Sequence, residues 1–153
     1  MIILIRTGSS LASIYSEVIE TIHRSKAIEH TIDIITLDDV VKKNNIDKID
    51  LLKIDTEGNE LECLKGFENF IRQGKVNVIH FEFNEMNVIS RVFFKDFWDF
   101  LPNYNFYRML PSGLLRIKEY EPTYCEIFAY QNIVCILKEF DKGKKYENIS
   151  LPS

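Results

Sequence analysis

Two acidic residues, Asp55 and Glu57, follow directly after a short apolar run at residues 49–54. The run has the length and composition of a buried strand, and Gly58 with Asn59 supplies a turn after it. In open α/β sheets, ligands bind at the edge formed by the carboxyl ends of the strands. A carboxylate at that edge can remove the proton of a hydroxyl group and make its oxygen nucleophilic. The structural alternative is that both acids cap the helix predicted after the turn and complement its dipole.

A second apolar segment, residues 75–83, predicts a neighbouring strand that ends in another acid, Glu82. Because side chains alternate along a strand, His80, Glu82 and Asn84 share one face. Glu82 is therefore expected near Asp55, across two adjacent strand ends. His80, Glu82 and Asp55 also carry the donor atoms of a metal site, which would suit a metal-dependent hydrolase. A lone histidine in a strand, however, is more often a hydrogen-bonded structural residue.

The hydrophobic pattern places these residues in an α/β fold. We predict strands at residues 2–6, 31–35, 49–54, 75–83, 105–110, 114–117 and 125–136, and helices at 12–28, 37–43, 60–74 and 90–101. The strand–helix–strand connection between residues 49 and 83 predicts a parallel pair with a right-handed crossover. A hairpin turn at 111–113 predicts an antiparallel end to the sheet. We expect the strand at 49–54 to be covered on both faces, because it is mostly apolar.

Composition limits the kinds of partner. The chain has 153 residues and a formal net charge of −4, which argues against non-specific nucleic-acid binding, because that function requires clustered cations. The spacing of its three cysteines supports neither a zinc site nor a disulfide framework, and we assign no metal. No apolar run is long enough to cross a bilayer. We therefore expect a soluble, cytoplasmic protein without a membrane partner.

The segment at residues 49–66, Ile-Asp-Leu-Leu-Lys-Ile-Asp-Thr-Glu-Gly-Asn-Glu-Leu-Glu-Cys-Leu-Lys-Gly, resembles the signature of FkbM-type methyltransferases. The resemblance continues at 36–40 (Thr-Leu-Asp-Asp-Val), in the strand at 78–83, at 97–113, and at Asn132 in the last predicted strand. It covers roughly residues 1–136 and is most specific in the middle. Asp38, within the Thr-Leu-Asp-Asp segment, is either an acid in the first turn of a helix or part of the rim of the active site.

The resemblance implies a methyltransferase that uses S-adenosylmethionine and acts mostly on oxygen, often on sugars or other small metabolites. It implies a partial Rossmann-like class I methyltransferase sheet, with a parallel centre and antiparallel C-terminal strands. In that interpretation Asp55, Glu57 and Glu82 are the catalytic residues. The residues His80, Asn84 and Asn59 would bind the substrate, a small-molecule or glycan acceptor.

The resemblance covers only the C-terminal half of the family's catalytic domain. The six glycines of the chain form no G-x-G cluster after a strand, so the cofactor-binding half is expected to be missing. We predict a methyltransferase-like domain at residues 1–137 and a polar, frayed tail at 138–153. Activity would then need a partner. The alternative is a non-catalytic half-domain that binds a partner chain, or a second copy, through its open sheet edge.

Overall fold

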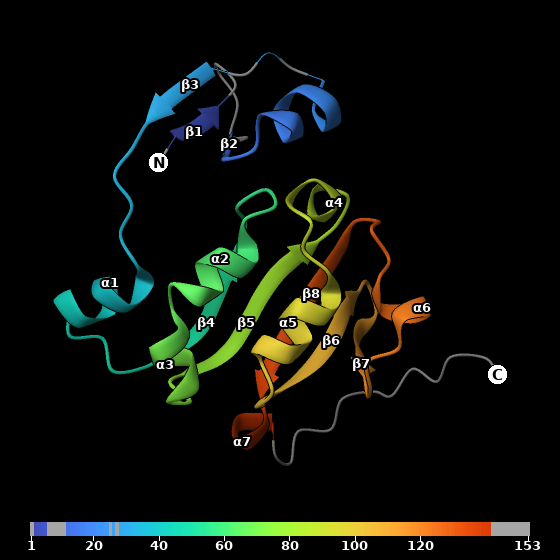
Figure 1. Cartoon of the computed structure of the whole chain (residues 1–153). Coiled ribbons are helices and arrows are strands. Elements are labelled where there is room, and N and C mark those ends of the chain that lie inside the picture. The colour runs from blue at the N-terminus through green and yellow to red at the C-terminus, as the bar shows by residue number, and fades with distance from the viewer. Residues whose placement is uncertain (1, 6–11, 25, 27, 142–153) are drawn as a thin grey trace.

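The structure is a computed structural model that describes residues 2–5, 12–24, 26 and 28–141. A small sheet contains β1 (Ile2–Ile5), β2 (Ala12–Ser13) and β3 (Ile28–Thr31), in the order β2-β1-β3. A larger sheet contains β4 (Ile49–Ile54), β5 (Val76–Phe83), β6 (Tyr104–Leu110), β7 (Gly113–Ile117) and β8 (Gln131–Leu137). Its order is β4-β5-β8-β6-β7 (Figure 1).

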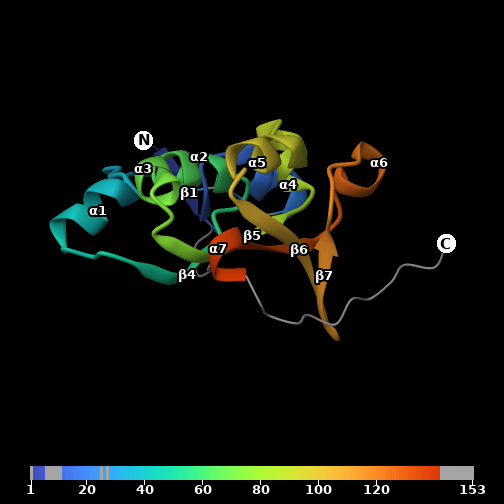
Figure 2. The ribbon, with the colours of Figure 1, turned by 90° about the horizontal axis from the view of Figure 1, so that it is seen from below.

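The described helices are short. They are the π-helix η1 (Val18–Ile22), α1 (Leu37–Lys43), α2 (Glu60–Lys65), α3 (Glu68–Arg72), α4 (Met86–Ser90), α5 (Phe94–Phe100), α6 (Pro122–Cys125) and α7 (Lys138–Asp141). Helices α2 to α5 lie on one face of the large sheet (Figure 2). None of the helices in the described ranges is long and apolar enough to cross a membrane.

The large sheet confirms the predicted α/β class and the predicted parallel pair. β4 and β5 run parallel, whereas β8, β6 and β7 are joined to β5 by antiparallel pairing. The parallel pair lies at one edge of the sheet and not at its centre, because the described chain adds no strand beyond β4. The carboxyl ends of β4 and β5 point toward the small sheet (Figure 1).

The expectation that β4 is covered on both faces is wrong. Leu51 in the middle of the strand is 61% exposed, and Lys53 is exposed beside it. Ile54, which points to the helical side, is buried. The reason is the two-layer architecture: helices cover one face of the sheet at β4, and the other face stays open. A mostly apolar strand can therefore lie at an exposed edge.

The N-terminal prediction of a helix at residues 12–28 is also wrong. That stretch contains β2, η1 and the start of β3, and the strand expected at 31–35 ends at Thr31. Val18 and Ile19, neighbours in sequence, are both fully buried, and η1 contacts α4. Burial of adjacent residues does not fit one stripe of a regular surface helix. The sequence Thr-Gly-Ser-Ser at residues 7–10 also predicts a turn, and these residues lie outside the described ranges.

One predicted helix is divided in the structure: the helix at 60–74 becomes α2 and α3. The helix expected at 90–101 is α5, and α4, which precedes it, was not predicted. The strand expected at 125–136 begins only at Gln131, as β8, and α6 lies before it. The break between α2 and α3 has a visible cause. Both carboxylate oxygens of Asp38 accept backbone N–H groups at the start of α3, from Asn69 at 3.1 Å and Phe70 at 3.0 Å.

We expect Asp38→Ala to lower the free energy of unfolding by about 1–2 kcal/mol, because it removes the acceptor for two N–H groups at a helix start. Urea unfolding followed by circular dichroism measures the change. The matched control is Asp47→Ala, an exposed aspartate, which should shift stability by less than about 0.5 kcal/mol. Equal effects of the two substitutions would show that Asp38 does not hold α1 to α3.

The first residues of the segment predicted as a polar tail form the helix α7. Asp141, at the end of α7, is 9% exposed, and its Oδ2 accepts the hydroxyl of Tyr107 at 2.7 Å. The amide of Asn105 donates to the same oxygen at 2.5 Å. α7 is therefore tied to β6. The rest of the predicted tail, residues 142–153, lies outside the described residues.

Candidate functional site

The loop between β4 and α2 carries Asp55 and Glu57. A third acid, Glu60, accepts hydrogen bonds from the backbone of this loop. Glu60 is 2% exposed, and its Oε1 accepts the backbone N–H of Thr56 at 3.0 Å and of Gly58 at 3.2 Å. The Thr56 hydroxyl donates to the same oxygen at 3.2 Å. Burial raises the pKa of Glu60, and these hydrogen bonds oppose the rise. Glu60 thus fixes the loop on which Glu57 stands.

We expect Glu60→Ala to lower the free energy of unfolding by about 2–3 kcal/mol, because it leaves buried N–H groups of Thr56 and Gly58 without an acceptor. Denaturant unfolding measures the change. The control is Glu62→Ala, since the side chain of Glu62 forms an exposed ion pair with Lys65 on the same helix. A loss for Glu62→Ala as large as that for Glu60→Ala would contradict the assignment.

The substitution Glu60→Gln tests the role of the side-chain oxygen as a hydrogen-bond acceptor separately from the role of the negative charge. Glutamine keeps a side-chain oxygen, so the loss should be smaller than with alanine. The pKa of Glu60 is raised in the folded protein above its ordinary value of 4.5. The stability that protonation contributes is therefore complete below that value and is lost as the pH rises through the raised pKa. Over that range, the wild-type protein should lose stability relative to Glu60→Gln.

Glu57 lies at the contact between this loop and the N-terminal unit. Its φ angle of 55° is in the left-handed region, where a residue with a side chain is strained. The hydroxyl of Ser13, a buried residue, donates to the Glu57 carbonyl at 2.9 Å. His23 Nε2 lies 3.6 Å from Glu57 Oε2. Burial raises the pKa of Glu57, His23 lowers it, and the charges of neighbouring acids raise it further.

Those neighbouring acids include the other two predicted catalytic residues. The negative charges of Asp55 and Glu82 both act on Glu57. Asp55 is paired with Lys53 at 2.6 Å, and its side chain is 44% exposed. Glu82 Oε1 accepts the hydroxyl of Tyr130 at 2.8 Å. The structure thus brings Asp55, Glu57 and Glu82 together at the ends of β4 and β5.

The remaining predicted residues of β5 are held by local hydrogen bonds. His80 Nε2 lies 2.7 Å from Asn132 Oδ1, and because an amide oxygen only accepts, the histidine donates. Asn84 is 5% exposed; its Oδ1 accepts the N–H of Met86, and its amide reaches Glu82 at 3.4 Å. The metal hypothesis gains no support, since no group of three or more His, Cys, Asp or Glu side chains within the described ranges could hold an ion.

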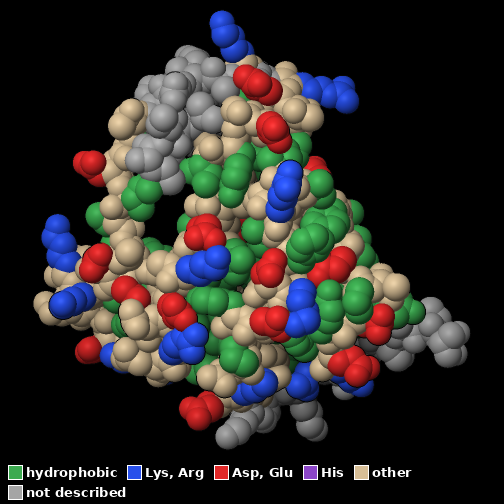
Figure 3. All heavy atoms as spheres, viewed as in Figure 1, with side chains coloured by type: hydrophobic (Ala, Val, Ile, Leu, Met, Phe, Trp, Pro, Cys, Tyr) green, Lys and Arg blue, Asp and Glu red, His purple; other side chains and the backbone are tan. Residues whose placement is uncertain are grey.

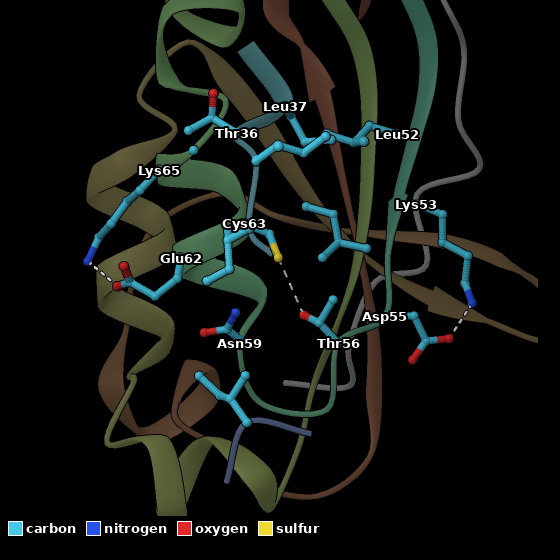
Figure 4. Close-up of a pocket in the computed structure, with 15 residues that line it drawn as sticks. Thr36, Leu37, Leu52, Lys53, Asp55, Thr56, Asn59, Glu62, Cys63 and Lys65 are labelled. Atoms are coloured by element: carbon cyan, nitrogen blue, oxygen red, sulfur yellow. Dashed lines mark hydrogen bonds and ion pairs between the residues drawn. The ribbon is translucent and has the colours of Figure 1, made fainter. Parts of the chain in front are cut away.

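A hollow of about 850 Å³ lies beside β4. We call it the β4 hollow; it is lined by residues 34–37, by residues of β4, the following loop and α2, by Gly66, and by Ile14 of the N-terminal unit. Leu37, Leu52 and Cys63 give it an apolar interior, and Lys53 and Asp55 point away from them (Figure 4). Asn59 lies at its loop end, with a buried Oδ1 that has no hydrogen-bond partner.

Several residues of the site did not stand out in the sequence. Ser13 and His23 lie in a segment that the sequence pattern assigned to a helix, so nothing linked them to Glu57. Tyr130 precedes β8, and only the pairing of β8 with β5 brings it to Glu82. Glu60 could have been found, because an acid after a glycine turn is well placed to accept the N–H groups of that turn.

Chemically, the site combines a base with hydrogen-bonding groups. The carboxylate of Glu57 has a raised pKa and is held by a strained backbone and by His23. Asp55 and Glu82 add two carboxylates whose charges act on it, and the hydroxyl of Tyr130 is bonded to Glu82. Such a site can accept a proton from a polar, uncharged group and bind further hydroxyls around it.

Comparison with known proteins identifies the family. The family profile described as the methyltransferase FkbM domain matches residues 3–107. No curated protein and no solved structure matches the chain. The matched range includes the β4–α2 loop and β5 but ends within β6, so it is shorter than the resemblance inferred from the sequence and does not reach Asn132. It confirms the Rossmann-like methyltransferase type of the sheet. Because the match spans more than half of the sequence, the chain belongs to the methyltransferase FkbM domain family.

Proposed function

We propose that the chain forms the acceptor side of an S-adenosylmethionine-dependent O-methyltransferase, which acts on a hydroxyl group of a small molecule or glycan. The observation that carries this proposal is the convergence of Asp55, Glu57 and Glu82 at two adjacent parallel strand ends. Glu57 suits the role of base, because its raised pKa lies nearer to neutral pH than that of a free carboxylate. Asp55 and Glu82 would accept hydrogen bonds from other hydroxyls of the acceptor.

S-adenosylmethionine, when bound, supplies an electrophilic methyl group on a sulfonium sulfur. The acceptor oxygen must lie in line with that methyl group and must lose its proton. Glu57 takes this proton and becomes a neutral carboxylic acid. His23, 3.6 Å from the carboxylate, orients the side chain for this transfer.

The residues present fit only part of a cofactor site. The loop end of the β4 hollow combines apolar side chains with the unpaired acceptor Asn59 Oδ1, which suits a purine and a hydrogen-bond donor. The sequence has no glycine-rich turn of the G-x-G type, the element that lets a backbone approach a nucleotide closely. We propose that another stretch of polypeptide supplies that wall, and that this chain alone binds the cofactor weakly.

Two further residues are proposed to line the acceptor side. His80 lies on the open face of β5, two residues before Glu82. Asn84 positions Glu82 through its amide and closes the turn after β5. Asn59, predicted from the sequence to bind the acceptor, is assigned in this proposal to the cofactor, because its free oxygen lies at the loop end of the hollow.

The test is a transfer assay with S-adenosylmethionine that carries a labelled methyl group. The cofactor is kept at millimolar concentration to offset weak binding, and the acceptors are a panel of sugars, polyols and phenols. We expect label in an alkali-stable ether, the product of hydroxyl methylation. Label found only on nitrogen or in an alkali-labile ester, or no transfer to any acceptor, would refute the proposal.

A second candidate function is a non-catalytic half-domain that binds a partner chain. It is favoured by the position of β4, which pairs with β5 along one edge and has no described strand along the other. Calorimetry discriminates between the two functions. Any saturable heat of S-adenosylmethionine binding that is lost with Asn59→Leu favours the methyltransferase, whereas no heat at millimolar cofactor favours the binding module.

A further inference from the structure

Tyr130 lies at the strand ends that carry the predicted acids, but it has no part in the proposed proton transfer. The residue is 64% exposed, although its hydroxyl donates to Glu82 Oε1 at 2.8 Å. The hydrogen bond to Glu82 raises the pKa of Tyr130, so the phenol stays protonated and cannot serve as a base. One bond at the hydroxyl thus fixes the direction of the ring and leaves most of its surface open to solvent.

Arg108, on β6, holds the segment that carries Tyr130. Its Nε donates to Gln131 Oε1 at 2.5 Å, and its Nη2 donates to the carbonyl of Tyr124. The amide of Gln131 in turn donates to the carbonyl of Ile127 at 2.5 Å. The connection between α6 and β8 is therefore bonded at both of its ends. A ring on an anchored segment loses little freedom when a ligand binds, which favours binding.

The groups beside the ring are bonded to one another and keep positions for further donors. Glu82 lies opposite Asn132 in the pairing of β5 with β8, so their side chains share the open face of the large sheet, opposite the helices. Glu82 accepts from Tyr130 on one oxygen and from the amide of Asn84, at 3.4 Å, on the other. A carboxylate has about four acceptor positions, so these two donors from the described residues leave room for hydroxyls of a ligand.

Polar groups alone do not mark a site on this protein. Figure 3 shows the helical side, where acidic and basic side chains are spread over the surface. The open face differs because its polar groups surround one exposed aromatic ring at the carboxyl ends of the strands. Farther along the same face the strands are apolar, and Tyr107, Val134 and Ile136 form a small buried cluster. The combination of a ring and acceptors is therefore local to the strand ends.

A ring beside hydrogen-bond acceptors fits a ligand that has both an apolar face and several hydroxyls. The C–H groups on one side of a pyranose sugar form such a face, which packs on the negative face of an aromatic ring. The sugar hydroxyls project from the rim and can donate to a carboxylate. An acyclic polyol has the hydroxyls without the flat face. A simple phenol has the flat face with a single hydroxyl and leaves acceptors of the site without donors.

We propose that Tyr130 determines the acceptor specificity: its ring stacks on one face of a pyranose, and Glu82 accepts a hydroxyl of the same sugar. The inference rests on the proposed function, because it takes Asp55, Glu57 and Glu82 as the acceptor side. It narrows the acceptor to a sugar in its ring form. Binding of the sugar requires neither the cofactor nor the β4 hollow, so it can be measured without methyl transfer.

The test is a titration of the full chain with the methyl pyranosides of glucose, galactose, mannose and xylose, followed by NMR with selective saturation of aromatic protons. We expect at least one sugar to bind saturably at millimolar concentration and to receive saturation on the C–H groups of one face. Tyr130→Leu should weaken this binding about three- to tenfold and remove the one-sided pattern. Tyr130→Phe keeps the ring and should retain the affinity within about twofold.

Tyr124→Leu is the matched control. Tyr124 is 65% exposed and belongs to α6, which lies on the helical side of the sheet (Figure 2), so its replacement should leave the affinity unchanged. Because Tyr130 is equally exposed, circular dichroism should show that each variant folds. Equal losses in the two leucine variants, a loss in Tyr130→Phe as large as in Tyr130→Leu, or no saturable binding of any pyranoside would overturn the proposal. Binding of a phenol in place of the sugars would overturn it in favour of a phenolic acceptor.

The labelled-methyl assay separates this inference from the proposed function. If both hold, Tyr130→Leu should raise KM for the pyranoside about three- to tenfold with kcat nearly unchanged, because the ring binds the ground state and the transition state alike. Sugar binding that depends on the ring, without any methyl transfer, would refute the proposed function and support this inference. Methyl transfer to hydroxyls with a KM that Tyr130→Leu does not alter would refute this inference alone.

Discussion

Glu57→Gln is expected to lower the rate of methyl transfer by about 10²–10⁴-fold at neutral pH, the usual contribution of a general base. Glutamine keeps the size of the side chain and the left-handed backbone, but it cannot accept the acceptor's proton. The free energy of unfolding should change little, since the hydrogen bond from Ser13 ends on the backbone carbonyl of residue 57. The labelled-methyl assay measures the rate, and urea unfolding measures the stability.

The pH profile gives a second, independent readout. The base acts in its ionised form, so the wild-type rate should rise as the pH passes through the pKa of Glu57, which lies above its ordinary value of 4.5. In Glu57→Gln this rise should be absent. Glu119→Gln, which changes an exposed glutamate, should keep both the rate and the profile of the wild-type protein. An unchanged profile in Glu57→Gln would assign the proton to another group.

Phe97→Ala is expected to lower the free energy of unfolding by about 3–5 kcal/mol. Phe97 is fully buried and stacks on Phe81 of β5, with ring centroids 4.3 Å apart. It also meets the ring of Phe83 edge to face at 6.3 Å. Truncation to alanine would leave a cavity between α5 and the sheet. Chemical denaturation monitored by circular dichroism should show the midpoint falling without a change in slope.

Two other substitutions calibrate this prediction. Phe97→Leu keeps most of the apolar volume and should cost less than alanine does. Phe93→Ala removes a phenylalanine that is 51% exposed and should cost less than about 1 kcal/mol. If Phe93→Ala and Phe97→Ala destabilised the protein equally, α5 would not be the helix that seals the core over β5.

The sequence predicted the centre of the fold well, because its signals are local. The apolar runs of β4 and β5, the turn at Gly58 and the crossover between them need only neighbouring residues to be recognised. Alternation along β5 was enough to place Glu82 beside Asp55, and electrostatic coupling of both acids to Glu57 agrees with that placement. The catalytic roles given to these acids stay predictions.

The errors arise where contacts between distant residues decide the structure. The break between α2 and α3 depends on Asp38, some thirty residues earlier in the chain than its bonding partners Asn69 and Phe70. The contact of Glu57 with Ser13 joins residues 44 positions apart. Leu51 is exposed because no described helix covers its face of β4. Periodicity within a short window contains none of this information.

The position of β8 has a consequence for biosynthesis. This strand comes last among the described strands, yet it lies between β5 and β6 and pairs with both. In a nascent chain that ends before Gln131, β5 and β6 lack the strand that pairs with both of them. Cooperative folding of the large sheet must therefore wait until residues 131–137 have been synthesised, and a nonsense mutation before Gln131 would release a product prone to aggregate rather than a smaller folded protein.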